Sequence, residues 1–204
     1  GRSRGLLRAG AFATLALLYG PLLVIGLYAF NRNVTQKWPI EELSTRWFRV
    51  AFEDEAVREA LLLSVLAALG ATAIALVLGT LASMAVARYA FFGREVITFA
   101  VILPIALPGI VTGLALQATI LDVLGPLGAS FGLSTIIVGH ATFCVVVVYN
   151  NVIARMRRTA GSLDEASADL GADSWQTFRY VMFPQLRTAL LAGGLLSFAL
   201  SFDE

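Results

Sequence analysis

The chain has 204 residues, of which 58% are hydrophobic and only 14% are Asp, Glu, Lys or Arg. A soluble domain carries about 25% charged residues, so this sequence has too little polar surface to cover a core in water. The net charge of +1 argues against a nucleic-acid partner. The single cysteine, Cys144, excludes a disulfide framework and a thiolate metal site. The composition therefore predicts a membrane protein.

Five segments are apolar over the roughly 20 residues that a helix needs to cross a bilayer. They are 11–30, 61–87, 96–121, 134–153 and a segment that begins near residue 188 and is still apolar at Glu204. The predicted fold class is therefore all-α, a polytopic helical bundle in the membrane. Because the fifth segment is unfinished, we expect a sixth span beyond it.

The Lys and Arg residues predict the orientation of the spans, since these residues concentrate in cytoplasmic loops. With the N-terminus inside, ten of them are cytoplasmic: Arg2, Arg4, Arg8, Arg88, Arg94, Arg155, Arg157, Arg158, Arg179 and Arg187. Five are external: Arg32, Lys37, Arg46, Arg49 and Arg58. We therefore expect a cytoplasmic N-terminus. The external segment 31–58 mixes charges with Trp38 and Trp47, which is typical of an interfacial segment.

The cytoplasmic loop 154–187 is neither low in complexity nor rich in Pro and Gly, so we expect it to fold. Ser162 followed three residues later by Glu165 predicts a capping box at the start of a short helix. Gly171 is suited to a left-handed turn at the end of that helix.

A second helix is predicted directly after the glycine. Asp173 and Gln176 have capping spacing, and the helical period places Trp175, Phe178 and Met182 on one face. We expect this helix to end near Pro184. Two short helices with a glycine elbow between them are suited to docking a partner.

The residues of the elbow form a spaced motif: Glu165-Ala166-Ser167, three residues, Gly171, nine residues, Val181, one residue, Phe183-Pro184. This motif resembles the EAA loop of binding-protein-dependent ABC importer permeases, with departures at Ser167 and Phe183, where the family has Ala and Leu. The resemblance covers 57–204 and implies an importer permease core there. Residues 1–56 are then the first transmembrane helix plus the outer interfacial segment.

The resemblance implies that the loop is a coupling helix that docks on a separate ATPase. The coupling residues that it implies are Glu165, Ala166, Ser167, Gly171 and Pro184. It implies as partners an ABC ATPase dimer, a second permease subunit that is a different chain, a periplasmic or lipid-anchored substrate-binding protein and the bilayer. The alternative for Glu165 is that it only caps its own helix.

The chain lacks the Gly-x-x-x-x-Gly-Lys-Ser/Thr motif. We therefore expect ATP and Mg to bind the partner ATPase, and this chain to be non-catalytic and without a cofactor. An intramembrane enzyme is disfavoured because the sequence has no catalytic or metal-ligand spacing. A non-transporting membrane scaffold remains an alternative.

Pro104 and Pro108 interrupt the third span, and each removes a backbone donor. In a bilayer, the freed carbonyls need a protein partner or a watery cavity. The prolines therefore indicate either a helix that lines the translocation path or a kink needed only for packing.

The outer half of the spans holds a tier of polar residues: Asp203, Glu204, His140 and Gln117. At 1.5 Å per residue, Asp203 lies about 24 Å along the fifth span from Arg187. Acids in spans usually face a cavity or a partner. Asp203 could contact a cationic substrate or form a helix–helix hydrogen bond, and His140 could be purely structural. Small residues at 193, 197 and 201 predict packing against a neighbouring helix.

The string 196–204 also resembles the fifth span of spermidine/putrescine permeases. An acidic pair at the outer entrance suits a substrate with several ammonium groups, so we expect a polyamine. The alternative is another substrate of the same family: ferric ion, sulfate, phosphate or a sugar.

Overall fold

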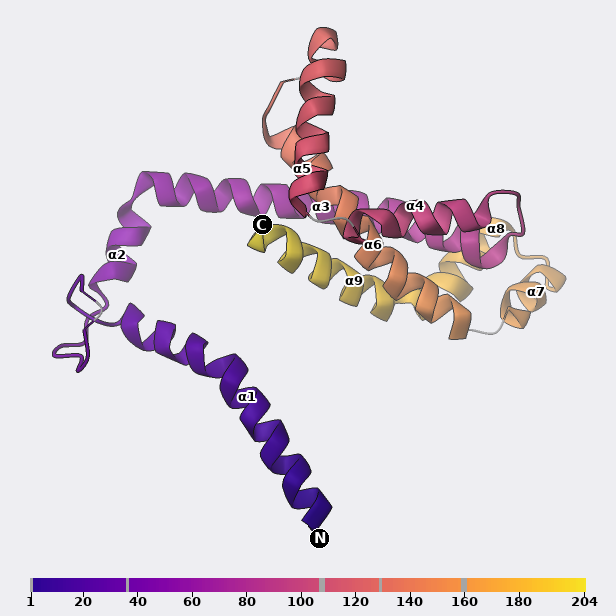
Figure 1. Cartoon of the computed structure of the whole chain (residues 1–204). Coiled ribbons are helices and arrows are strands. Elements are labelled where there is room, and N and C mark those ends of the chain that lie inside the picture. Colours follow the sequence, from indigo (N-terminus) through magenta and orange to yellow (C-terminus); the bar gives the residue numbers. More distant parts are fainter. Residues whose placement is uncertain (1, 36, 107–108, 129, 159–160) are drawn as a thin grey trace. The chain divides into compact units, whose positions relative to one another are not determined.

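The computed structural model describes residues 2–35, 37–106, 109–128, 130–158 and 161–204, and these are almost entirely helical (Figure 1). Among them the one β contact is an isolated antiparallel bridge between Asn31 and Leu43. The chain divides into two compact units, 1–61 and 62–204. The predicted all-α polytopic fold is confirmed.

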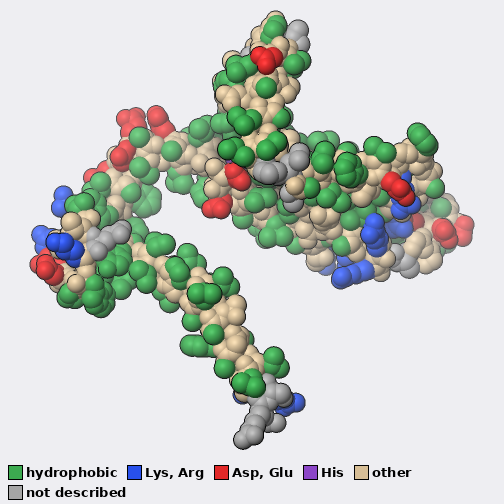
Figure 2. All heavy atoms as spheres, in the orientation of Figure 1, with side chains coloured by type: hydrophobic (Ala, Val, Ile, Leu, Met, Phe, Trp, Pro, Cys, Tyr) green, Lys and Arg blue, Asp and Glu red, His purple; other side chains and the backbone are tan. Residues whose placement is uncertain are grey.

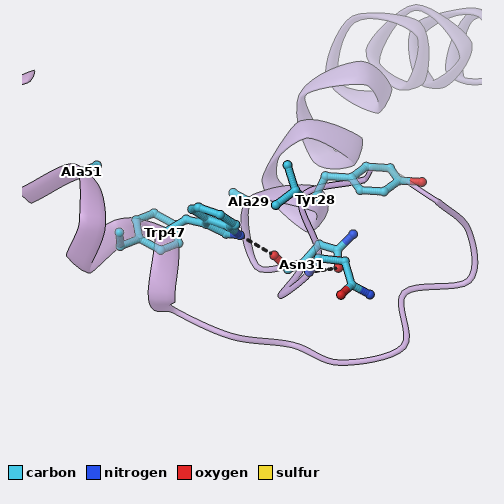
Figure 3. Close-up of a pocket in the computed structure, with 8 residues that line it drawn as sticks. Tyr28, Ala29, Asn31, Trp47 and Ala51 are labelled. Atoms are coloured by element: carbon cyan, nitrogen blue, oxygen red, sulfur yellow. Dashed lines mark hydrogen bonds between the residues drawn. The ribbon is translucent and has the colours of Figure 1, made fainter. Parts of the chain in front are cut away.

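The first unit contains α1 (Arg2–Ala29) and α2 (Arg46–Glu53). Helix α1 is apolar, passes through Pro21 without ending, and is exposed along nearly all of its described length. The loop between the helices is held to α2 by the Trp47 indole, which donates to the Asn31 carbonyl at 2.9 Å (Figure 3). The Phe30 and Phe48 rings lie 5.2 Å apart. These contacts hold the loop against α2.

The core of the second unit is formed by α3 (Glu55–Arg88), α6 (Leu133–Arg158) and α9 (Phe183–Asp203). Small residues allow close approach of these helices: a Cβ at Gly79 would lie 2.9 Å from the Val145 carbonyl oxygen. A Cβ at Gly193 would lie 3.2 Å from the Val148 Cα. We call these contacts of α6 with α3 and α9 the helix seam.

Polar side chains also join the helices of the seam. Ser197 Oγ donates to the Cys144 carbonyl at 3.2 Å, and Cys144 Sγ donates to the Ser197 carbonyl at 3.4 Å. The Ser83 hydroxyl lies 3.1 Å from the Tyr149 carbonyl across α3 and α6. The predicted packing role of the small residues 193, 197 and 201 is confirmed, because Ser201 also contacts α6, through His140.

The third apolar segment is divided into α4 (Arg94–Ala106) and α5 (Gly109–Ala118), and α5 continues into the π-helical segment η1 (Thr119–Leu124). The direction of α4 differs by 101° from that of α5 and η1 taken together. Helix α4 continues through Pro104, so the break comes after this proline. Pro108 lies outside the described residues. Within the described residues, four helices are long and apolar enough to cross a membrane, and this bent pair makes up to five.

The stretch between the third and fourth apolar segments, residues 122–133, is helical in its first half. Segment η1 continues into the 3-10 turn η2 (Gly125–Leu127), and the chain turns only at Gly128, with φ +92°. Gly and Pro did not end the helix here because Pro126 lies in the first turn of η2, where its missing N–H has no helical partner to lose.

The prediction that a helix ends near Pro184 is wrong. Helix α8 (Ser174–Gln176), the π-helical segment η3 (Thr177–Met182) and α9 form one helical stretch. Pro184 lies in the first turn of α9, where an N–H is not required. The side-chain amide of Gln185 donates to the Val181 carbonyl at 2.8 Å, so backbone around the proline remains hydrogen-bonded.

Candidate functional site

The elbow predicted in the loop 154–187 consists of α7 (Ser162–Asp169), a turn at Gly171 and the start of α8. Gly171 has φ +84°, the left-handed conformation that favours glycine. The Gly171 N–H donates to the Ala168 carbonyl at 2.9 Å, and the Ala172 N–H donates to the Ser167 carbonyl at 3.0 Å. This is a Schellman motif. The predicted glycine cap of the first helix is confirmed.

The predicted capping box between Ser162 and Glu165 is wrong. The N-cap is Gly161, whose carbonyl accepts from the Asp164 and Glu165 N–H groups at 3.0 and 3.3 Å. Ser162 is already inside the helix, so its hydroxyl is past the position from which it could cap the first turn. Glu165 therefore does not close a capping box, and its side chain is exposed.

The second predicted capping box is confirmed. Asp173 Oδ1 accepts from the Gln176 N–H at 2.8 Å, and Gln176 Oε1 accepts from the Asp173 N–H at 3.0 Å. The Trp175 and Phe178 rings lie 5.7 Å apart, while Met182 is buried in the core. The capping box thus specifies where this helix starts, and packing in the core fixes the position that carries Met182.

Ser167 is the one side chain of α7 that is buried. Its hydroxyl lies 2.9 Å from the Thr177 hydroxyl and donates to the Asp164 carbonyl at 2.8 Å. An alanine at this position would leave the Thr177 hydroxyl without this partner. The departure from the family's Ala therefore has a structural reason, since it joins α7 to η3.

The outward face of α7 carries apolar residues that sequence reasoning missed. Leu163 is 48% exposed and Leu170, the C-cap, is 89% exposed. At helical spacing they share a face with the exposed Ala166. A leucine at each end of a short polar helix, beside a glycine turn, is the sequence signal that could have predicted this face. We call Leu163, Ala166 and Leu170 the docking face.

Basic side chains gather near the elbow. Arg155, Arg157 and Arg158 lie in the last turn of α6, and Figure 2 shows Lys and Arg side chains concentrated at this end of the second unit. Cations at a helix C-terminus are favoured by its dipole. Arg155 Nε also donates to the Gln185 carbonyl at 3.0 Å, which ties the end of α6 to α9.

The polar residues of the outer tier are only partly brought together. His140 Nδ1 lies 2.8 Å from Ser201 Oγ, which places this histidine in a hydrogen bond between α6 and α9. Asp203 and Glu204 are exposed at the end of the chain. Gln117 is exposed on α5, and no hydrogen bond joins it to His140 or Asp203 in the part of the chain that the structure describes.

The outer tier offers carboxylates without competing cations. Among the described residues, neither Asp203 nor Glu204 forms a hydrogen bond or an ion pair within the chain. No three His, Cys, Asp or Glu side chains in the described ranges gather as a metal site.

Comparison with known proteins gives a family and several relatives. The model of the family "Binding-protein-dependent transport system inner membrane component" matches residues 75–204. The putrescine transport system permease protein PotI of Escherichia coli (strain K12) is 33% identical over 194 residues, covering 92% of this chain and 67% of the relative.

Two further relatives differ in the substrate that they name. The spermidine/putrescine transport system permease protein PotC of Haemophilus influenzae is 29% identical over 204 residues, covering 99% of this chain and 77% of the relative. The probable sulfate transport system permease protein cysT of Chlorella vulgaris is 35% identical over 159 residues, covering 74% of this chain and 60% of the relative.

Proposed function

This chain belongs to the family of binding-protein-dependent transport system inner membrane components, and from that premise we propose a permease subunit that imports polyamines and docks a separate ATPase at its elbow. The family membership and the apolar helices make it a multi-pass inner-membrane transport protein. The observation that carries the docking proposal is the docking face, an exposed apolar surface on a helix outside the spans.

The elbow is suited to docking because its apolar surface is exposed while other contacts fix the position of its helix. Ala166 and Leu170 face outward, while the Schellman turn at Gly171 and the Ser167–Thr177 contact hold the helix behind them. Glu165 is free of a capping box and can pair with a cation of the partner. We assign the coupling role to Glu165, Ala166, Ser167 and Gly171, and with them to Pro184 at the start of α9.

The remaining partners follow from the kind of importer. A binding-protein-dependent system needs a substrate-binding protein outside and an ATPase inside, and we propose that ATP and Mg bind that ATPase. A second permease subunit, proposed to be a different chain, completes the path. This chain then acts as a non-catalytic subunit.

The proposed substrate rests on the relatives and on charge. Permeases named for putrescine and spermidine match 92–99% of this chain. Asp203 and Glu204 offer two carboxylates that suit a substrate carrying several ammonium groups. The second candidate is another solute of the same family, favoured by the relative named for sulfate, but exposed acids would repel an anion.

Docking is tested by replacing Leu170 with Asp in the assembled transporter and measuring how much ATPase copurifies from membranes. A charge on the docking face should reduce the ATPase recovered at least tenfold, because an ionised carboxylate buried in an apolar interface is strongly disfavoured. Leu170→Met keeps the face apolar and should retain the ATPase. Equal recovery with Leu170→Asp and wild type would remove this face from the interface.

The proposed orientation, with a cytoplasmic N-terminus, is tested by cysteine labelling from the two sides of the membrane. Ser162 and Val34 are exposed, and the native Cys144 is buried, so it should not interfere. A cysteine at 34 should react only from outside and one at 162 only from inside. Labelling of both from one side would contradict the topology.

The substrate is tested by competition in cells that express the complete transporter. Uptake of labelled putrescine should be inhibited by spermidine and not by sulfate. Inhibition by sulfate alone would replace the polyamine assignment with the second candidate.

A further inference from the structure

We propose that Arg88 and Asp164 form a positioning link that ties the docking elbow to the cytoplasmic end of α3, so that movement of the elbow is passed to that span. The proposal rests on the proposed function, since it concerns how a docked ATPase acts on the permease. Arg88 is the last residue of α3, and Asp164 lies in the first turn of α7. Arg88 Nη2 lies 2.8 Å from Asp164 Oδ2.

The ion pair is partly withdrawn from water. The two side chains are 22% and 21% exposed, whereas those of the other ion pair in the described ranges, Arg32 with Glu42, are 60% exposed. Partial burial strengthens the attraction between the charges and makes either charge costly if left alone. Its low exposure therefore makes the Arg88–Asp164 pair a specific contact, unlike an ion pair on the surface.

The surroundings of Arg88 leave little room for another arrangement. A Cβ added at Gly161 would lie 3.3 Å from Arg88 Nη1, so the backbone at the start of α7 lies directly against the guanidinium. Met156, Met182, Gln185 and Leu186 line a small cavity with Arg88. Arg88 thus shares this cavity with residues of α6, η3 and α9, while its guanidinium contacts α7.

The pair is not reinforced by a wider network. Arg88 Nε and Asp164 Oδ1 are buried and have no hydrogen-bond partner among the described residues. Each charge therefore depends mainly on the other as its partner.

The geometry of α7 separates this link from the docking face. At 100° per residue, Asp164 lies about a quarter-turn from Leu163 and away from Leu170. Two side chains then hold α7 to the membrane helices: Ser167 contacts Thr177 on the stretch that leads into α9, and Asp164 contacts Arg88 on α3. An ATPase that moves the docking face must move both spans together or break one of these contacts.

The test is a charge exchange in the complete transporter. Arg88→Asp and Asp164→Arg are made singly and together, and three quantities are measured: membrane abundance, copurified ATPase, and stimulation of ATP hydrolysis by loaded binding protein. Each single variant should lose at least tenfold in stimulation while ATPase still copurifies, and the double variant should return to within about threefold of wild type. Asp169→Asn, which removes an exposed charge from the same helix, should change none of the three.

Milder variants keep the test decisive if charge reversal prevents folding. Asp164→Asn and Arg88→Gln keep the side-chain shapes and should still lower stimulation at near-normal abundance. Unchanged stimulation in these variants, or a double exchange that restores abundance but not stimulation, would overturn the link. Failure of the proposed function is seen separately, since wild type would then retain no ATPase, and the link would fall with it.

Discussion

The helix seam and the elbow lie close along the chain and are built by different physical means. In the seam, glycines bring backbones into contact, and Ser197 and Cys144 exchange hydrogen bonds between helices. In the elbow, a Schellman turn, one capping box and two side-chain contacts hold a helix whose surface is mostly exposed. The comparison indicates that seam variants should cost stability, whereas elbow variants should cost coupling and leave the protein in the membrane.

The largest expected effect is in the seam, for Gly79→Leu. A Cβ there would lie 2.9 Å from both the Val145 carbonyl oxygen and the Val148 Cβ, so α3 and α6 would have to separate. Overpacking costs about 1–3 kcal/mol, and 1.4 kcal/mol is about a factor of ten. Membrane abundance, measured by immunoblot, should fall about tenfold. Gly113→Leu, at a glycine where an added Cβ would meet nothing within 4 Å, should leave abundance unchanged. A similar loss of abundance at Gly113 would show that the effect does not depend on close helix packing in the seam.

The next effect is in the elbow, for Gly171→Val. A β-branched residue at φ +84° is disfavoured by more than about 1 kcal/mol, so the turn into α8 should be misplaced. Transport should be lost while membrane abundance stays near wild type, with the ATPase either dissociated or no longer stimulated. Gly171→Asn, which tolerates a left-handed turn, should keep substantial uptake. Normal transport by the valine variant would contradict the coupling role.

A smaller effect is expected at the outer end of α9, for Asp203→Asn. This change keeps the side-chain volume and removes the charge, and a hydrogen bond to a charged group is worth about 1.5–3 kcal/mol. Polyamine uptake should fall about tenfold or more at normal abundance. If Asp203 has only a structural hydrogen-bonding role, Asn should be tolerated and Leu should lower abundance, which would take Asp203 out of the substrate path.

The smallest expected effect is again in the helix seam, for Ser197→Ala. Ser197→Ala removes the hydroxyl that donates to the Cys144 carbonyl, and interhelical hydrogen bonds in membranes average about 0.6 kcal/mol. The thermal midpoint of the detergent-solubilised protein should fall by about 1–3 °C, with uptake unchanged. A large loss of abundance would show that this hydroxyl does more than join two helices.

Local signals in the sequence predicted local structure. Apolar runs located the helices, Gly171 marked its left-handed turn, and Asp173 with Gln176 marked the start of α8. The capping box at Ser162 failed because spacing alone cannot show that the helix begins at Gly161.

Contacts between distant parts of the chain were not predictable in the same way. Arg88 and Asp164 are 76 positions apart by their residue numbers, and nothing in either local sequence pairs them. The exposure of Leu170 likewise depends on which face of α7 packs inward through Ser167. The passage of the helix through Pro184 depends on the π-helical register before it and on the Gln185 amide, which residue type alone does not reveal.

The unbroken helical stretch from Ser174 to Asp203 has a mechanical consequence. It has 30 residues and, at 1.5 Å per residue, a length of about 45 Å. Its N-terminal end begins shortly after the Gly171 turn, and its C-terminal end carries Asp203. A tilt of a few degrees at the N-terminal end would move the Asp203 carboxylate through several ångströms, as a lever arm does, without any rearrangement of the residues between.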